Sequence, residues 1–169
     1  MDERDYTWYG TLVHGWGREK SDRYMKQLAQ QSPLFRRGHA LIAQLVVAGE
    51  FPLGWVYSFR VETMKQQGAP IEWIDTFNPI VVELGGIGLS ARAKNPNAAK
   101  LFIDYVISRE GQLIVRGGKR NPRNASRNDV EPLIPKMDQS RLKSKRVPDE
   151  VETNLAQYAR EYRDIFRVK

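Results

Sequence analysis

The stretch SPLFRRGHALIAQLVV, residues 32–47, places two arginines, a glycine and a histidine directly before an apolar run. The guanidinium of Arg37 can fork onto a carboxylate or phosphate, and Gly38 lets the backbone approach a ligand closely. His39 adds a hydrogen bond or a proton switch near neutral pH. If a helix begins here, its free N–H groups and its dipole favour an anion at the same place. From the residues alone, an anion-binding loop and a solvated helix cap are equally good interpretations.

Signatures of catalysis are missing elsewhere in the chain. There is no phosphate-binding loop, no G-x-S-x-G and no H-E-x-x-H, and the chain has no cysteine. His14 and His39 are its two histidines, which excludes a multi-histidine metal site; His14 is predicted to lie on a helix surface. GGIG at residues 85–88 lies inside a strand pattern and predicts a bend or a close backbone approach. We therefore expect a binding protein and not an enzyme.

Composition and charge indicate a globular chain with a basic excess. The 169 residues are 41% hydrophobic and 28% charged, with a net charge of +7. The excess is concentrated in RGGKRNPRNASRNDV, residues 116–130, and SRLKSKRV, residues 140–147. This tract is either a solvated loop and tail or a contact surface for nucleic acid, although no aromatic residue interleaves it for base stacking. The apolar run 40–48 is too short to span a bilayer, and the start MDERDYTWYG has neither part of a secretory signal.

Hydrophobic periodicity predicts alternating helices and strands. Helices are expected at 5–16, 18–31, 38–49 and 59–67, then as a pair within 95–115 that opens at Asn95, and finally from Pro148 to the C-terminus. Strands are expected at 34–35, 53–57, 71–74 and 79–90. This order favours an α/β fold with a mainly parallel sheet flanked by helices and a C-terminal helical extension. The expected division is one lobe at residues 1–120, with an interlobe strand near 79–90, and a basic loop plus docked helix at 121–169.

Three segments together resemble one family. RRGHALIAQLVVAGEFPLGWVYSFRVETMKQQGAPIEW, NPIVVELGGIGLSARAKNPNAAKLFIDYVISREGQ and DVEPL are similar to the second half of ABC-transporter solute-binding proteins of the ferric-iron type. The resemblance runs over nearly all of the chain. It implies a type II periplasmic-binding fold of which this chain holds one lobe and the C-terminal helices. It also implies a periplasmic or extracellular location, although the chain shows no signal peptide.

The resemblance assigns ligand-binding roles to six residues. In such proteins the second lobe presents a loop at a helix N-terminus to the ligand, which corresponds here to Arg37, Gly38 and His39. Ferric members bind iron through adjacent tyrosines, whereas Tyr57 stands alone in GWVYSFRVE. One phenolate without a second tyrosine argues against tight direct capture of iron. Tyr57 is either a single metal ligand or, together with Trp55, a residue that stacks on or hydrogen-bonds an organic ligand; a core-facing position is the alternative for both and is favoured for Trp55. Gly85 and Gly86 are expected on the interlobe strand.

The function implied by this resemblance is capture of a small anionic solute, a ferric ion or a metal chelate for delivery to an ABC permease. An intact member closes two lobes around its ligand, so a single lobe is expected to bind weakly or not at all. Its open cleft face would favour self-association. The alternatives are a basic module that contacts nucleic acid through residues 116–127 and 143–146, and a gene remnant.

Overall fold

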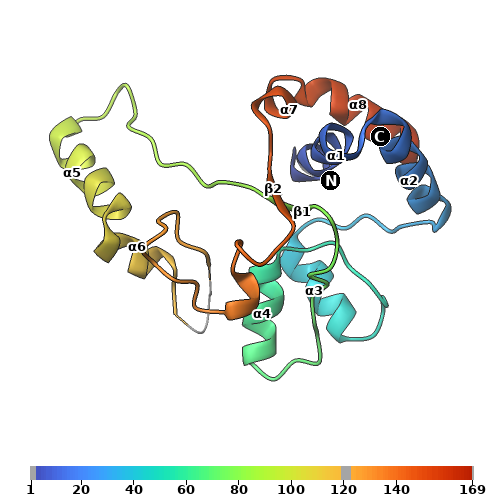
Figure 1. Ribbon diagram of the computed structural model, residues 1–169, viewed down its shortest axis with the longest axis horizontal. Helices are drawn as coiled ribbons and strands as arrows, with labels where there is room; N and C mark the ends of the chain where they lie inside the picture. The colour runs from blue at the N-terminus through green and yellow to red at the C-terminus, as the bar shows by residue number, and fades with distance from the viewer. Residues whose placement is uncertain (1–2, 119–122, 169) are drawn as a thin grey trace. The chain divides into compact units, whose positions relative to one another are not determined.

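A computed structural model describes residues 3–118 and 123–168 of this α/β protein. The described part holds eight α-helices, one short 3₁₀ helix and two short strands, labelled in Figure 1. The chain divides into two compact units, each formed from separate stretches of sequence. Unit 1 comprises Met1–Arg37, Thr76–Leu84 and Lys143–Lys169, and unit 2 comprises Gly38–Asp75 and Gly85–Leu142. The basic loop from residue 123 thus belongs to unit 2, and the C-terminal helices belong to unit 1.

Four helices form the body of unit 1. They are α1 (Glu3–Trp16), α2 (Arg18–Gln30), α7 (Asp149–Thr153) and α8 (Leu155–Phe166). The first two confirm the expected helices, whereas the single helix expected from Pro148 onwards is divided into α7 and α8 at Asn154. Gly17, at φ +85°, separates α1 from α2 in a conformation that suits glycine. The apolar side chains of these helices meet in a core of Tyr6, Trp8, Tyr9, Leu12, Met25, Val151, Tyr158, Ala159 and Tyr162. Helix α8 therefore docks on unit 1 through its apolar face.

The sheet is much smaller than the sequence pattern suggests. β1 (Ile80–Val82) pairs in parallel with β2 (Ser144–Arg146), with Val81 opposite Lys145. The expected strand 79–90 is thus wrong beyond residue 82, and the strands expected at 34–35, 53–57 and 71–74 are irregular segments. A strand requires a neighbouring ladder of backbone hydrogen bonds, and β1 finds one in β2.

Unit 2 contains the remaining helices. They are α3 (His39–Val47), α4 (Ser58–Gln66), α5 (Pro96–Ile107), α6 (Arg109–Val115) and the 3₁₀ helix η1 (Pro135–Met137). Gly49 follows α3 at φ +77°, where its N–H donates to the Val46 carbonyl and that of Glu50 donates to the Leu45 carbonyl. These bonds end α3 at Gly49. Helix α6 follows α5 directly (Figure 1), and Ser108 between them caps α6 by accepting from the N–H of Gly111 at 3.1 Å.

Large apolar side chains of unit 2 remain exposed. Leu53 is 74% exposed and Trp55 is 48% exposed, so the core-facing position expected for Trp55 is wrong. Other exposed members are Leu41, Ile74, Ile87, Leu89, Leu101, Phe102, Tyr105, Ile107, Ile114 and Val115. Ala43, Val61, Val130 and Met137 are the buried apolar residues among the described part of unit 2. Among the described helices, none has both the length and the apolar character needed to cross a membrane.

Candidate functional site

Two helix N-termini meet in unit 2 through the side chains of His39 and Tyr57. His39 is the first residue of α3, and Tyr57 is the N-cap of α4. Their ring centroids lie 4.4 Å apart. The first N–H groups of a helix have no carbonyl partner within the helix, and neither N-cap residue, Gly38 or Tyr57, caps its helix through its side chain. The positive ends of two helix dipoles therefore lie near the same pair of rings.

The pair continues into a stack that ends in two guanidinium groups. The Tyr57 ring stacks on the Phe59 ring, with centroids 5.5 Å apart and planes inclined by 25°. The guanidinium carbons of Arg123 and Arg60 lie 4.0 Å and 5.2 Å from the Phe59 centroid. We call His39, Tyr57, Phe59, Arg60 and Arg123 the aromatic–arginine cluster. It combines hydrogen-bond donors, stacking surfaces and positive charge, the groups that bind a small anion.

Backbone hydrogen bonds hold Arg123 in this cluster although it belongs to the basic loop. Its N–H donates to the Arg116 carbonyl at 2.8 Å. The next residue, Asn124, donates from its side-chain nitrogen to the Met137 carbonyl at 2.7 Å, and the Ser126 N–H donates to Gln112 Oε1 at 2.7 Å. This part of the loop is therefore fixed to α6 and η1.

Gly54 sets how closely the segment before Tyr57 approaches α3. A Cβ added at Gly54 would lie 2.8 Å from Cγ2 of Ile42 and 2.9 Å from Cγ2 of Val46. Such distances are shorter than packed carbons tolerate. The glycine therefore lets residues 51–57 lie directly on α3, which places Tyr57 next to His39.

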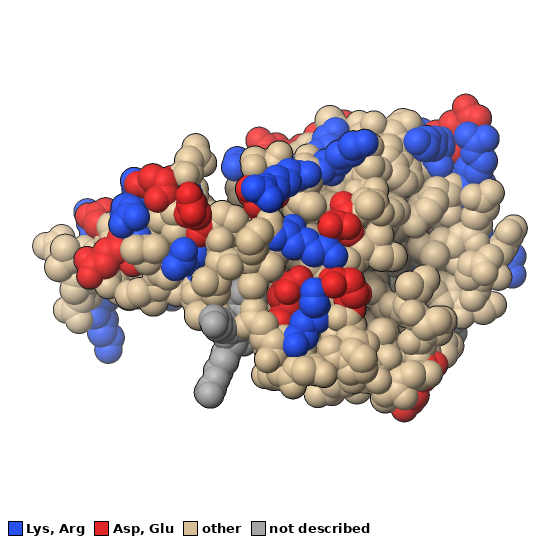
Figure 2. Space-filling model, turned by 60° about the horizontal axis from the view of Figure 1, so that its bottom comes forward, with Lys and Arg blue, Asp and Glu red and all other residues tan. Residues whose placement is uncertain are grey.

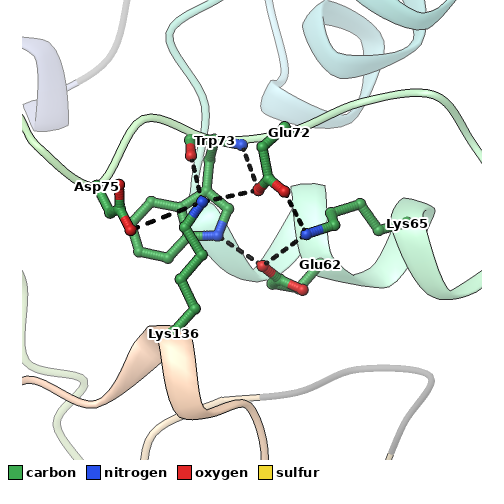
Figure 3. A network of polar contacts seen from close by, with 6 residues as sticks. All are labelled: Glu62, Lys65, Glu72, Trp73, Asp75 and Lys136. Carbon is green, nitrogen blue, oxygen red and sulfur yellow. Dashed lines mark hydrogen bonds and ion pairs between the residues drawn. The ribbon is translucent and has the colours of Figure 1, made fainter.

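A network of charged residues anchors α4 from its other end (Figure 3). The Glu72 carboxylate accepts from Lys65 Nζ at 2.6 Å, from Lys136 Nζ at 3.0 Å and from the Trp73 N–H at 2.9 Å. The buried Glu62 carboxylate accepts from Trp73 Nε1 at 2.6 Å. Lys136 also donates to the Trp73 carbonyl at 2.8 Å. These contacts join α4, the segment around residues 72–75 and η1.

The charges of this network shift the pKa values of Glu72 and Lys65. Hydrogen bonds from Lys65 and Lys136 lower the pKa of Glu72 from 4.5 to about 2. The same carboxylate raises the pKa of Lys65. Both groups therefore stay charged near neutral pH, and α4 keeps its anchor over the physiological range.

The structure brings together some of the residues predicted from the sequence. Gly38 precedes α3 at φ +91°, and His39 and Tyr57 are in contact. Arg37 is the last residue of unit 1, so the cluster described above is built without it. A Cβ added at Gly85 or Gly86 would meet no atom within 4 Å among the described residues, so the expected close approach is not seen there. His14, predicted on a helix surface, is partly exposed and its Nδ1 lies 3.0 Å from Lys145 Nζ.

Three members of the cluster were missed by sequence reasoning. Phe59 and Arg60 directly follow the predicted Tyr57, and the run Tyr-Ser-Phe-Arg at a helix start is a signal that could have included them. Arg123 is far away in the sequence, and no local pattern connects it to Tyr57. Within the described residues, no group of three His, Cys, Asp or Glu side chains is placed to hold a metal ion. A metal role for Tyr57 therefore stays a prediction.

Comparison with known proteins finds one similar protein of undefined role. An uncharacterized protein of Haemophilus influenzae is 29% identical over 107 residues, which cover 63% of this chain. The match covers 31% of the length of that protein. No family model and no solved structure matches the chain.

Proposed function

We propose that this chain is a solute-binding component of an ABC import system that binds a small anionic solute or a metal chelate at the aromatic–arginine cluster. The observation that carries the proposal is the contact between His39 and Tyr57, because it brings the N-termini of α3 and α4 together. The proposed class is the one that the sequence resembles. It includes a type II periplasmic-binding fold of which this chain is a single lobe, and a periplasmic or extracellular site of action.

The cluster suits binding of an anion. Helix N-termini and guanidinium groups attract negative charge, and the Tyr57 hydroxyl and His39 imidazole offer directional hydrogen bonds. The rings of Tyr57 and Phe59 offer a face to a planar group such as a carboxylate or a chelate. In the proposed complex, the ligand's charge is placed by Arg60 and Arg123 and its orientation by His39 and Tyr57. Delivery to a permease then follows from closure of a second lobe over the ligand.

The test is a thermal melt of the chain with and without phosphate, small carboxylates and ferric citrate. A ligand that binds the folded state at about 100 times its Kd stabilises it by about 2.7 kcal/mol. Because one lobe supplies half of the contacts, millimolar ligand is required. We expect one ligand to raise the Tm, and Arg123→Ala and Tyr57→Phe to reduce the shift.

The matched control is Arg127→Ala. Arg127 lies in the same basic loop, but it forms two hydrogen bonds to the Asp129 carboxylate at 2.7 and 3.0 Å. The variant removes the same charge and should keep the full Tm shift. If the ligand-induced rise in Tm is equally small in the Arg123→Ala and Arg127→Ala variants, the ligand responds to net charge and not to the cluster. If no ligand raises the Tm of the wild type, the proposed site is rejected.

The nucleic-acid alternative has one observation in its favour and several against it. Phe59 supplies an aromatic ring beside Arg123 of the basic tract. However, Arg116 donates to the Glu131 carbonyl at 3.1 Å, and Arg141 lies 3.5 Å from Asp138. Figure 2 likewise shows acidic side chains beside many of the basic ones on the face it presents. Retention on single-stranded DNA that falls steeply with salt and is lost in Lys143→Ala/Arg146→Ala would favour this alternative.

A further inference from the structure

The end of helix α1 and strand β2 of unit 1 meet through the side chains of His14 and Lys145. Nδ1 of His14 lies 3.0 Å from Nζ of Lys145, and a Cβ added at Gly15 would lie 3.7 Å from the same ammonium nitrogen. The Lys145 side chain therefore lies along the last turn of α1, where the negative end of the helix dipole favours a positive charge. Next to it, Trp16 Nε1 donates to the Asn78 carbonyl at 2.8 Å, so the end of α1 also contacts the segment before β1.

The hydrogen bond from Lys145 fixes the protonation state of His14. An ammonium group carries three donors and no acceptor, so Nδ1 of His14 must accept and is without a proton. The ring proton is then on Nε2, which lies 4.0 Å from the Glu150 carboxylate of α7. With a proton on both nitrogens, the imidazolium loses the acceptor for Lys145 and places a second positive charge beside the ammonium group. Protonation of His14 therefore breaks its contact with β2.

The charged groups around the His14 ring determine the direction of the change. Among the described residues, Lys145 of β2 and Glu150 of α7 are the charged groups that contact the ring. Arg18 of α2 and Glu161 of α8 pair with each other instead. The repulsion from Lys145 acts across 3.0 Å, whereas the attraction of Glu150 acts across 4.0 Å from a carboxylate that is 69% exposed. At these distances the repulsion is the stronger effect, so protonation favours a contact with Glu150 over one with Lys145.

We propose that His14 is a pH-sensitive switch that joins α1 to β2 while it is neutral and to α7 when it is protonated. Histidine is the side chain whose charge ordinarily changes between about pH 5 and 8. The His14 side chain is 41% exposed, so protons from solvent reach it. The chain passes between the two units at residues 75–76, 84–85 and 142–143, next to β1 and β2. A weaker attachment of β2 to α1 in mild acid therefore weakens the strand pair in the segments that connect the units.

Hydrogen exchange of the amides at the ends of the strand pair tests the switch in the full chain. The Ile80 N–H donates to the Lys143 carbonyl at 2.9 Å, and the Val147 N–H donates to the Val82 carbonyl at 3.3 Å. After correction for intrinsic exchange, the protection of these two amides should fall about two- to fivefold from about pH 7.5 to about pH 5.5, as expected for an exposed contact. The amides of α2, measured in the same samples, should keep their protection, which excludes unfolding of the whole unit.

Three variants separate His14 from other titrating groups. His14→Asn keeps an acceptor near the place of Nδ1 but takes up no proton in this range, so protection should stay high at both pH values. Lys145→Met removes the donor, so protection should be low at both pH values and should not respond to pH. Lys143→Met is the matched control, because it removes a lysine two residues earlier on the same segment and outside the His14 contacts. This variant should keep the response of the wild type.

The tautomer of His14 provides an independent measurement. At about pH 7.5, ¹⁵N spectra of the imidazole should show the ring proton on Nε2, and Lys145→Met should shift the Nδ1 resonance. The proposal is overturned by a proton on Nδ1, by an Nδ1 resonance that Lys145→Met leaves in place, by equal protection at the two pH values, or by a full pH response in His14→Asn. None of these outcomes depends on anion binding, because His14 and Lys145 belong to unit 1 and the aromatic–arginine cluster is built from unit 2.

Discussion

Replacing Glu72 by glutamine should loosen α4 at neutral pH and have little effect in strong acid. In the wild type the Glu72 carboxylate accepts from Lys65 at 2.6 Å and from Lys136 at 3.0 Å. Glutamine keeps the shape of the side chain but removes the negative charge. It therefore weakens both ion pairs while it preserves an oxygen for the Trp73 N–H.

The size of the stability loss in Glu72→Gln depends on how far the paired side chains are exposed to water. The Glu72 side chain is 57% exposed and those of Lys65 and Lys136 are 31% and 27% exposed, so water screens the pairs. Exposed ion pairs contribute about 0.2–1 kcal/mol each, and two of them give a loss of about 1 kcal/mol. The pKa of Glu72 is lowered to about 2 by folding, so its contribution is complete above pH 4.5 and is lost as the pH falls towards 2.

Native-state hydrogen exchange of the α4 amides measures this loss within unit 2. At neutral pH, Glu72→Gln should speed exchange about fivefold, as expected for 1 kcal/mol. The difference from wild type should narrow below pH 4.5. Asp129→Asn is the matched control, since it also removes a carboxylate with a lowered pKa but one outside this network. Equal exchange in wild type and Glu72→Gln, or a difference that widens in acid, would refute the reasoning.

Three further substitutions have expected outcomes. Gly54→Ala forces a methyl against α3 and should lower the free energy of unfolding by about 1–3 kcal/mol, whereas Gly86→Ala, with open space around it, should leave denaturant melts unchanged. Gly111→Ala is expected to be the most damaging change, because its Cβ would lie 2.0 Å from the Tyr105 carbonyl oxygen; loss of α5–α6 helicity by circular dichroism checks this. Tyr9→Phe removes the hydroxyl that donates to Asp22 at 2.9 Å and should cost about 1–2 kcal/mol in urea unfolding of unit 1; an unchanged midpoint contradicts it.

Helices were predictable because their information is local. The spacing of Trp8, Leu12 and Trp16 fixes the buried face of α1, and Tyr158 and Tyr162 do the same for α8. Gly17 and Gly49 mark helix ends through positive φ angles that glycine adopts without strain. A reader of the sequence therefore has enough to place most helices within a few residues.

Strands were predicted poorly because an apolar run indicates that a segment tends to be buried but does not indicate which other segment pairs with it. Residues 53–57 have the composition of a buried strand, yet Leu53 and Trp55 are exposed. β2, in contrast, is the basic sequence Ser-Lys-Arg, which carries no strand signal, and it forms because residues 144–146 lie beside Ile80–Val82. Whether residues 53–57 and residues 144–146 form strands thus depended on pairing with a segment distant in the sequence.

The candidate site shows the same limit. His39 was recognisable from the Arg-Gly-His run before an apolar segment, and Tyr57 was assigned through the resemblance to ferric-type solute-binding proteins. Their contact depends on Gly54, whose missing side chain lets the segment before Tyr57 lie on α3. Arg123 joins them through backbone hydrogen bonds to Arg116 and the neighbouring turn. Tertiary contacts of this kind have no counterpart in local spacing.

The two units differ in how completely they bury their apolar residues, and this difference bears on the proposed anion site. Unit 1 surrounds Leu12, Met25 and Val151 almost completely. Unit 2 holds the aromatic–arginine cluster but leaves α5 uncovered on its outer face, so its folded state gains less from its own core. An anion bound at α3 and α4 therefore stabilises unit 2 by mass action, and the gain is largest in proportion where the unit's own core contributes least.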